Sequence, residues 1–441
     1  MKICIIGLGL VGLSLATTFA ERGFKVIGIE KNEEKYKQIK NGVAPFFEPL
    51  VSEQLKKNLN KNLEIVNDIE YGFCNSDVIF ICVGTPSKDD GSVNLSSVEE
   101  VSNHLAGFLK NKSAKYPVIV IKSTVQPGTT ERIKKILEEN SSKHEGKHFG
   151  ICMNPEFLRE GSAVNDLLFP HLTVIGTNDN KTRDIMHELY HKFYQDSKIN
   201  ILDTNPINAE LIKYANNAFL ATKISFINTI ANICNKIPGS NVDIIAKAIG
   251  TDPRIGYDFL KAGPGYGGSC FPKDVKGFVS FSRSIGYEPI LLQSTNLVNQ
   301  QQPMIIVDII KNKFGDISGK IISILGVSFK KGTDDIRDSS SLQIIQSLIE
   351  KGVIVKVHDP MALKNLKTVF ENKIIYCTNI IECLKDSICC LILTDWDEYK
   401  TLDEYIFKNN MQKPCIIDTK RLLNYNDFVN LDYIAVGIGE K

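Results

Sequence analysis

The first segment of the chain constrains the fold more than any other part of the sequence. An apolar stretch, Lys2–Ile6, leads directly into the pattern Gly7-x-Gly9-x-x-Gly12, and a second apolar stretch, Lys25–Ile29, follows after helix-compatible sequence. In such a unit the first glycine permits a tight turn, the second permits close approach of a pyrophosphate, and the third permits close helix–strand packing. We therefore predict a dinucleotide-binding turn that opens a parallel sheet, with a helix N-terminus facing the phosphates.

An acidic residue at the end of the second stretch indicates which dinucleotide is bound. Glu30 would accept hydrogen bonds from ribose hydroxyls and repel a 2′-phosphate, which favours NAD over NADP. Thr85 and Thr124 each follow a further apolar strand, at the edge where ligands bind in such sheets. The expected cofactor contacts are Gly7, Gly9, Leu10, Val11, Gly12, Glu30, Thr85 and Thr124, with Lys273 farther along the chain.

The alternation of strand-like and helix-like segments continues and is then interrupted. Further β-branched stretches, such as Val78–Val83 and Val118–Ile121, predict a doubly wound sheet with helices on both faces. After Pro206 no glycine or proline occurs until Pro238, which predicts one long helix over Pro206–Ile237.

The last part of the chain resembles its beginning. Lys320–Leu325 predicts a strand followed by a glycine turn, and Val353–Val357 predicts a strand that ends in an acidic residue, Asp359. We therefore predict an α/β fold with two doubly wound Rossmann-like domains, residues 1–203 and 315–441, joined by a central long-helix domain, residues 204–314.

Composition excludes several classes of function. Of the 441 residues 52 are basic and 51 acidic, so no field of one sign attracts nucleic acid or an anionic membrane. No apolar run reaches the ~18–20 residues that span a bilayer. The eleven cysteines include no CxxC pair with zinc spacing, and the histidines lack metal-binding spacing. We expect a cytoplasmic protein with reduced thiols, no metal, and no nucleic-acid or membrane partner.

A glycine-rich segment carries the strongest local signal for covalent chemistry. Gly267 and Gly268 let the backbone come close to a ligand, and Cys270 follows them. Lys273 would favour the nucleophilic thiolate, and Asp274 is placed to handle protons. An isolated cysteine is most often a core residue, but the flanking Gly-Gly and Lys-Asp pairs favour a nucleophile.

Two further segments carry groups suited to acid–base and oxyanion chemistry. Glu210, Lys213 and Asn217 share one face of the predicted long helix, where preplaced donors would stabilise a developing alkoxide. Glu156 and Glu160 share a face if their segment turns helically. Taken alone, the helix group is better explained as a polar surface stripe, and the two carboxylates are equally well explained as a capping segment.

Eight short motifs occur in order along almost the whole chain. They are GLGLVG at 7–12, VGTP at 83–86, KSTV at 122–125, NPEFLREGSA at 154–163, ELIKYANNAFLATKISF at 210–226, DPRIG at 252–256, GYGGSCFPKD at 265–274 and LGVSFKKGTDDIRDSS at 325–340. Together they resemble the UDP-glucose 6-dehydrogenase family of the UDP-glucose/GDP-mannose dehydrogenases. The resemblance implies an NAD-binding domain, a helical dimerisation domain and a UDP-binding domain. It also implies oxidation of UDP-glucose to UDP-glucuronate by two successive hydride transfers to NAD.

The resemblance implies catalytic roles at the matching positions. Cys270 would add to the C6 aldehyde as a thiohemiacetal, and oxidation of this adduct gives a thioester that water cleaves. Thr124 and Asp274 would hold and activate water, while Lys213 and Asn217 would stabilise oxyanions. Alcohol-to-acid oxidation without release of the aldehyde needs a covalent tether, and a thiol is suited to it.

The resemblance also implies how the substrate is held. Glu156 would assist thioester hydrolysis, and Glu160 would hold neighbouring groups in place. Arg254 would reach the sugar nucleotide of the neighbouring subunit in a homodimer. The expected substrate contacts are Glu156, Phe157, Leu158, Glu160, Lys213, Asn217, Arg254, Gly267, Phe271 and Lys330.

One departure from the family pattern leaves a substrate contact open. The run Asp418-Thr419-Lys420-Arg421 stands where Asp-Gly-Arg is common, so the arginine expected at the sugar nucleotide is either replaced by Lys420 or supplied by Arg421. GDP-mannose 6-dehydrogenase is the nearest alternative activity, followed by a UDP-N-acetylhexosamine dehydrogenase. A non-catalytic NAD and nucleotide-sugar sensor is an alternative of another class, and the joint presence of the nucleophile and its partners disfavours it.

Overall fold

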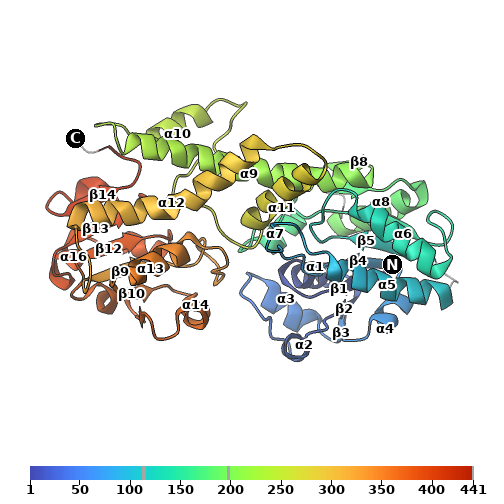
Figure 1. The fold of residues 1–441 in the computed structure, drawn as a ribbon. Helices are drawn as coiled ribbons and strands as arrows, with labels where there is room; N and C mark the ends of the chain where they lie inside the picture. Colours follow the sequence, from blue (N-terminus) through green and yellow to red (C-terminus); the bar gives the residue numbers. More distant parts are fainter. Residues whose placement is uncertain (112–115, 196–198, 440–441) are drawn as a thin grey trace. The chain divides into compact units, whose positions relative to one another are not determined.

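The computed structural model describes residues 1–111, 116–195 and 199–439 (Figure 1). The chain forms two compact units, Met1–Asn216 and Asn217–Lys441, and the division falls within helix α9 (Pro206–Cys234). Each unit is built around a sheet of its own.

The first unit contains an eight-stranded sheet with the strand order β3-β2-β1-β4-β5-β6-β7-β8. The strands are β1 (Lys2–Ile6), β2 (Lys25–Ile29), β3 (Leu63–Val66), β4 (Val78–Ile81), β5 (Val118–Ile121), β6 (Gly150–Met153), β7 (Thr173–Gly176) and β8 (Ile201–Thr204). Neighbouring strands pair in parallel except β6 and β7, which are antiparallel. The prediction of a parallel sheet is therefore correct up to β6 and wrong at the β6–β7 pair.

Helices cover both faces of this sheet because its strands are apolar on both sides. Ile3 and Ile5 of β1 belong to one buried cluster, which contains residues of α1 (Leu10–Glu21) and α8 (Asn180–Tyr194). Cys4 and Ile6 belong to the opposite cluster, which contains residues of α5 (Ser96–Asn111) and α6 (Thr129–Ser141). Each fully buried side chain of this kind contributes about 1.5–3 kcal/mol. The remaining helices of the unit are α2 (Glu33–Lys40), α3 (Val51–Asn58), α4 (Ile69–Cys74) and α7 (Ala163–Leu168).

Helices α9, α10 (Val242–Gly250), α11 (Phe271–Ser284) and α12 (Ile290–Phe314) follow in the chain (Figure 1). Helix α9 begins at Pro206 as predicted but ends at Cys234, before the predicted end at Ile237. It ends there because the Cys234 carbonyl accepts hydrogen bonds from the Ile237 amide and the Ser240 hydroxyl, which close a turn.

The second unit contains a six-stranded sheet with the order β11-β10-β9-β12-β13-β14, which repeats the order of β3 to β6 in the first sheet. Its strands are β9 (Ile321–Leu325), β10 (Ile354–His358), β11 (Ile375–Tyr376), β12 (Cys389–Ile392), β13 (Cys415–Asp418) and β14 (Asp432–Ala435), all paired in parallel. The remaining elements are α13 (Ser340–Glu350), α14 (Leu363–Phe370), α15 (Ile380–Leu384), α16 (Glu404–Asn410) and the 3₁₀ turns η1 (Asp397–Thr401) and η2 (Tyr425–Asp427).

Buried clusters on the two faces of this sheet include residues of α12, α13 and α14 on one side and of α15 and α16 on the other. The predicted fold class, with two Rossmann-like sheets joined by long helices, is confirmed. The predicted boundaries at residues 203/204 and 314/315 stay predictions. No helix in the described part of the chain is long and apolar enough to cross a membrane.

Candidate active site

The glycine turn after β1 has the geometry that its sequence predicted. Gly7 has φ +91°, a left-handed conformation that favours glycine. A Cβ atom on Gly12 would lie 1.9 Å from the Gly7 carbonyl oxygen, whereas one on Gly9 would meet nothing within 4 Å. The first and third glycines therefore satisfy the protein's own packing. The second leaves open space beside the N-terminus of α1, where a pyrophosphate binds in turns of this type.

Glu30 lies beside this turn. Its carboxylate accepts hydrogen bonds from the backbone amides of Leu8, at 3.1 Å, and Asn32, at 2.9 Å. The side chain is buried, and the two amides fix it at the end of β2. This is the place at which a carboxylate meets the adenosine ribose in dinucleotide-binding folds; the contact itself stays a prediction.

Thr85 and Thr124 meet where β4 and β5 end. The Thr85 hydroxyl donates to the Thr124 carbonyl at 2.8 Å, and the neighbouring Ser123 hydroxyl donates to the Val83 carbonyl at 2.7 Å. These bonds join the two loops at the carboxyl edge of the sheet, next to the position where the strand order reverses between β1 and β4.

A buried ion pair joins the loop after β6 to helix α9. Lys213 Nζ lies 2.9 Å from Glu156 Oε1, and the Leu158 amide donates to Glu156 Oε2 at 2.6 Å. Burial by itself would raise the pKa of Glu156, but the charges of Lys213 and Lys122 and these hydrogen bonds bring it below its ordinary value. Glu156 is therefore held as a carboxylate. Lys213 also lies 5.5 Å from the centre of the Phe157 ring.

The loop that carries Glu156 and the half-buried Glu160 is held by a residue far away in sequence, which the sequence analysis did not identify. Glu48 is buried, and its carboxylate accepts hydrogen bonds from the Gly161 amide at 2.6 Å and the Ala163 amide at 2.8 Å. It satisfies backbone donors at the start of α7, as a capping carboxylate does. No local pattern could reveal this role, because Glu48 and its partners are far apart in sequence.

In the second unit, Cys270 stands immediately before α11. Its side chain is exposed, and its carbonyl accepts the Asp274 amide at 2.8 Å, which opens the helix. The positive end of the helix dipole favours an anion there, and therefore the thiolate. The Ser269 hydroxyl lies 3.7 Å from the sulfur.

Asp274 is buried beneath this helix start and is fully engaged. Its carboxylate accepts hydrogen bonds from Asn217 Nδ2 and from Lys273 Nζ, both at 2.6 Å. The structure thus brings Asn217, from the motif at 210–226, to the Lys273-Asp274 pair of the motif at 265–274. Lys273 forms an ion pair with Asp274. The predicted contact between Lys273 and the cofactor stays a prediction.

The glycines before Cys270 allow close packing within the second unit. A Cβ atom on Gly267 would lie 2.4 Å from the Asp338 carbonyl oxygen, and one on Gly268 would lie 2.9 Å from the Phe329 ring. The Gly268 amide donates to the Arg337 carbonyl at 2.8 Å. These glycines let the loop pack against the segment that follows β9, and the predicted substrate contact at Gly267 stays a prediction.

Three other predicted substrate contacts also lie in the second unit. Arg254 is exposed and pairs with Asp252 at 2.6 Å. Lys330 Nζ lies 5.6 Å from the centre of the Phe329 ring. Phe271 contacts the rings of Phe259 and Tyr266, with centroids 6.0 and 6.1 Å away.

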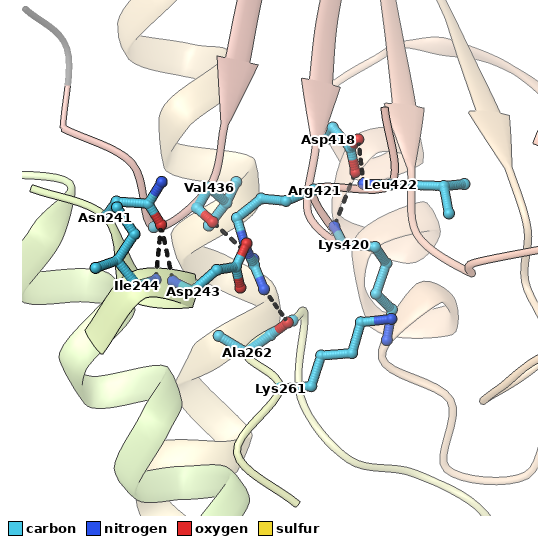
Figure 2. Close-up of polar contacts among 12 residues, drawn as sticks. Asn241, Asp243, Ile244, Lys261, Ala262, Asp418, Lys420, Arg421, Leu422 and Val436 are labelled. Atoms are coloured by element: carbon cyan, nitrogen blue, oxygen red, sulfur yellow. Dashed lines mark hydrogen bonds and ion pairs between the residues drawn. The ribbon is translucent and has the colours of Figure 1, made fainter. Parts of the chain in front are cut away.

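The structure distinguishes between Lys420 and Arg421 (Figure 2). The Arg421 guanidinium donates to Asp243 at 2.8 Å and to the carbonyls of Val436 at 2.8 Å, Ala262 at 2.9 Å and Thr419 at 3.2 Å. Its side chain is only 3% exposed, so its donors are used within the protein.

Lys420 contrasts with its neighbour. Its ammonium makes no hydrogen bond with the described residues, and a Cβ atom on Gly263 would lie 3.1 Å from it. Burial lowers the pKa of Lys420, and the charge of Asp395 partly offsets this. Lys261 also lies near Lys420, and its ammonium donates to Asp395 at 2.8 Å. This cluster therefore contains an ammonium with unused donors.

Two Rossmann-like sheets, an open glycine turn with an acid after the second strand, and a cysteine at a helix start define a class of dinucleotide-dependent α/β oxidoreductases. The chain belongs to the UDP-glucose/GDP-mannose dehydrogenase family. Residues 1–194 match its NAD binding domain, 207–301 its central domain and 323–425 its UDP binding domain. The resemblance seen in the eight motifs and the expected NAD cofactor are thereby confirmed.

Full-length relatives support the same assignment. UDP-glucose 6-dehydrogenase TuaD of Bacillus subtilis is 40% identical over 99% of this chain and 93% of its own length. UDP-glucose 6-dehydrogenase AglM of Haloferax volcanii is 38% identical over 98% of this chain and 99% of its own. The solved UDP-glucose dehydrogenase of Pyrobaculum islandicum superposes with a TM-score of 0.90 at 32% identity, covering 99% of this chain and 98% of the other.

Proposed function

We propose that this chain oxidises UDP-glucose to UDP-glucuronate, with two NAD reduced and one water consumed per turnover. The observation that carries the proposal is the exposed Cys270 at the start of α11, beside the buried Asp274–Asn217 pair, in a chain with an NAD-binding domain. A nucleophile of this kind suits an oxidation that continues past the aldehyde.

UDP-glucose is favoured over the alternative sugar nucleotides. The relatives named UDP-glucose 6-dehydrogenase reach 40% identity over nearly the full chain. A solved UDP-N-acetylmannosamine dehydrogenase of Staphylococcus aureus is 25% identical, with a TM-score of 0.82. A GDP-mannose dehydrogenase of Pseudomonas aeruginosa is 30% identical but superposes with a TM-score of only 0.56.

The proposed reaction uses Cys270 as a covalent tether. NAD, when bound at the glycine turn, accepts the hydride in each of the two oxidations. The C6 hydroxyl loses its proton to Asp274 through a water molecule that Thr124 helps to hold, and Lys213 and Asn217 stabilise the developing alkoxide. The Cys270 thiolate then adds to the aldehyde carbon, and the second oxidation converts the thiohemiacetal to a thioester.

Hydrolysis of the thioester completes the proposed reaction. The carbonyl carbon gains a bond to the water oxygen and loses its bond to sulfur, which leaves as the Cys270 thiolate. One water proton goes to the Glu156 carboxylate, and the acid product loses the other to solvent. The lowered pKa of Glu156 keeps this base ionised, although it also makes it a weaker base, so its position must supply much of the effect.

We assign the missing substrate cation of the family pattern to Lys420. The Lys420 ammonium has unused donors. The Arg421 guanidinium, in contrast, makes four hydrogen bonds within the protein. A partly buried ammonium of this kind suits an anionic or hydroxyl-rich ligand. Lys420→Met should raise KM for UDP-glucose about tenfold or more with little change in the Kd for NAD, as measured by calorimetry. An unchanged KM in this variant would exclude the assignment.

The chain is also proposed to act as a homodimer in the cytoplasm. Phe219, Phe226 and Ile233 of the second unit form an exposed apolar row, 48–65% exposed, at the spacing of one helix face of α9. A second copy of the same helix is the partner that such a row fits. All eleven cysteines lie in the described part of the chain and all are free thiols, which suits a reducing compartment.

A direct assay tests both substrate and mechanism. A panel of nucleotide sugars should give NADH release with UDP-glucose far above GDP-mannose, at two NADH per UDP-glucose. Cys270→Ala should abolish this four-electron turnover while NAD binding survives. Cys270→Ser should accumulate an ester that intact-protein mass spectrometry detects, because an ester hydrolyses more slowly than a thioester. Near-normal kcat in a folded Cys270→Ala variant would refute the covalent route.

A further inference from the structure

Lys122 is a buried lysine to which the reaction proposed above gives no role. It follows β5, and its side chain is 6% exposed. Its Nζ donates to Asn154 Oδ1 at 2.8 Å and to the Pro155 carbonyl at 3.2 Å. A buried ammonium loses its solvation by water and is unfavourable unless neighbouring groups compensate for this loss. A lysine at this position therefore needs a reason beyond packing, because an apolar side chain would fit at lower cost.

The contacts of Lys122 fix the turn that presents Glu156. Asn154 is completely buried, its Oδ1 also accepts the Tyr190 hydroxyl, and its Nδ2 donates to the Val174 carbonyl at 2.7 Å. The ammonium thus ties the end of β5 to the two residues that immediately precede Glu156. A shift in this turn would move the carboxylate directly.

The charge of Lys122 also reaches Glu156. The Lys213–Glu156 pair is neutral as a unit, so Lys122 is an additional positive charge beside it. The other ionisable groups facing Lys122 are Cys82 and Cys152, and burial raises the pKa of both thiols to about 12. These thiols stay neutral near pH 7–9. The charge of Lys122 is therefore felt mainly by Glu156 and Lys213.

We infer that Lys122 is a positioning residue for the hydrolytic step. It holds the turn before Glu156 and keeps this carboxylate ionised when Lys213 is engaged by an oxyanion, so that Glu156 can accept the proton of the attacking water. The inference rests on the proposed function, and it assigns Lys122 to the cleavage of the thioester rather than to either hydride transfer. If Lys122 served only to fill the core, its substitution would slow the hydride transfers and the hydrolysis to a similar extent.

Lys122→Met separates these possibilities, because methionine keeps the unbranched stem and removes the ammonium. In rapid mixing with saturating NAD and UDP-glucose, this variant should release two NADH per Cys270 at rates within about twofold of wild type. Steady-state turnover should then be slower by about tenfold or more, as expected for a displaced general base. Mass spectrometry of the quenched protein should show the acyl adduct. Glu156→Gln, run in parallel, should accumulate the same adduct.

Lys122→Arg provides the matched variant that keeps the charge. It should hydrolyse the thioester faster than Lys122→Met, and it should remain active at high pH. In the wild-type enzyme, hydrolysis should slow as the pH rises through the pKa of Lys122, about 8, because the neutral amine donates more weakly than the ammonium to Asn154 and Pro155 and holds the turn before Glu156 less firmly. This loss should be absent from Lys122→Arg, whose guanidinium stays charged. The wild-type pH profile remains informative even where Lys122→Met fails to fold.

Three results would overturn the inference. Hydrolysis at the wild-type rate in Lys122→Met, with adduct present in Glu156→Gln, rejects the role of Lys122 alone. Equal slowing of hydride transfer and hydrolysis in Lys122→Met also rejects it, because that is the effect of general loosening. Absence of the adduct from Glu156→Gln rejects the proposed role of Glu156, and the inference with it.

Discussion

For the buried carboxylates near the candidate site, the hydrogen-bond partner determines the role of the group. Glu210 illustrates this, because the sequence placed it on one helix face with Lys213 and Asn217. Its carboxylate accepts the Gly128 amide at 2.6 Å and both the amide and hydroxyl of Thr130, at 2.7 and 2.6 Å. It therefore caps α6, whereas Lys213 pairs with Glu156 and Asn217 donates to Asp274.

Lys122 should destabilise the fold that it serves. Its pKa falls from 10.5 to about 8 because burial disfavours the charge. Below pH 8 this costs about 3 kcal/mol, at about 1.4 kcal/mol per pH unit between the two pKa values. Between pH 8 and 10.5 only the unfolded chain holds the proton, so the folded state regains stability as the pH rises. The cost at pH 9.5 is about 1 kcal/mol.

We therefore expect Lys122→Met to gain stability relative to wild type by about 2 kcal/mol more at pH 7 than at pH 9.5. Urea unfolding of both proteins at the two pH values measures this difference. The lost hydrogen bonds to Asn154 and Pro155 affect both pH values equally and cancel. If the difference in unfolding free energy between Lys122→Met and wild type is the same at both pH values, burial does not lower the pKa of Lys122.

Glu30 should determine the choice of cofactor. Its carboxylate lies beside the glycine turn, where a 2′-phosphate would be repelled. Glu30→Ala should therefore narrow the preference for NAD over NADP, mainly by improving kcat/KM with NADP. Comparable kcat/KM for the two cofactors in the wild-type enzyme would contradict this assignment.

Two glycines of the N-terminal strand–turn–helix element have different roles: Gly12 is required for packing, and Gly9 is expected to be required for NAD binding. A Cβ atom on Gly12 would meet the Gly7 carbonyl at 1.9 Å, and this backbone cannot yield without opening the turn. Gly12→Ala should lower both Tm and NAD affinity. Gly9 has nothing within 4 Å of its Cβ position, so Gly9→Ala should leave Tm within about 2 °C and weaken NAD binding alone.

Calorimetry with and without NAD tests this pair. An equal loss of Tm in the two variants would show that the open space at Gly9 belongs to the fold rather than to the ligand. Normal NAD affinity in a stable Gly9→Ala variant would exclude close approach of the pyrophosphate at this turn.

The whole molecule is expected to be complete only as a dimer. The exposed apolar row of α9 needs a partner surface, and Arg254 is proposed to serve the sugar nucleotide of the other subunit. Phe226→Lys should give monomers in sedimentation equilibrium, with a much higher KM for UDP-glucose and a nearly unchanged Kd for NAD. Tyr405→Lys, on α16, is the matched control because its side chain is 73% exposed. A fully active monomer would contradict the dimer proposal.

Local sequence determined the elements and the order of the chemistry along the chain. Apolar stretches specified β1, β2 and β5 with the observed bounds, because a strand buried on both faces must be continuously apolar. The Gly7–Gly12 pattern and Pro206 likewise specified a turn and a helix start, since glycine and proline restrict the backbone locally. The motif match then supplied the family and the candidate roles.

Tertiary structure decided which partner each polar group has, because such partners are distant in sequence. Only the fold shows that Glu48 holds the loop beyond Glu156, that the Arg421 guanidinium makes four hydrogen bonds within the protein, and that Gly267 makes room for the Asp338 backbone. Helix periodicity placed Glu210 and Lys213 on the same face, but it could not distinguish a cap from an ion pair. The physical reason is that burial and hydrogen bonding depend on what packs against a residue, which a local pattern does not specify.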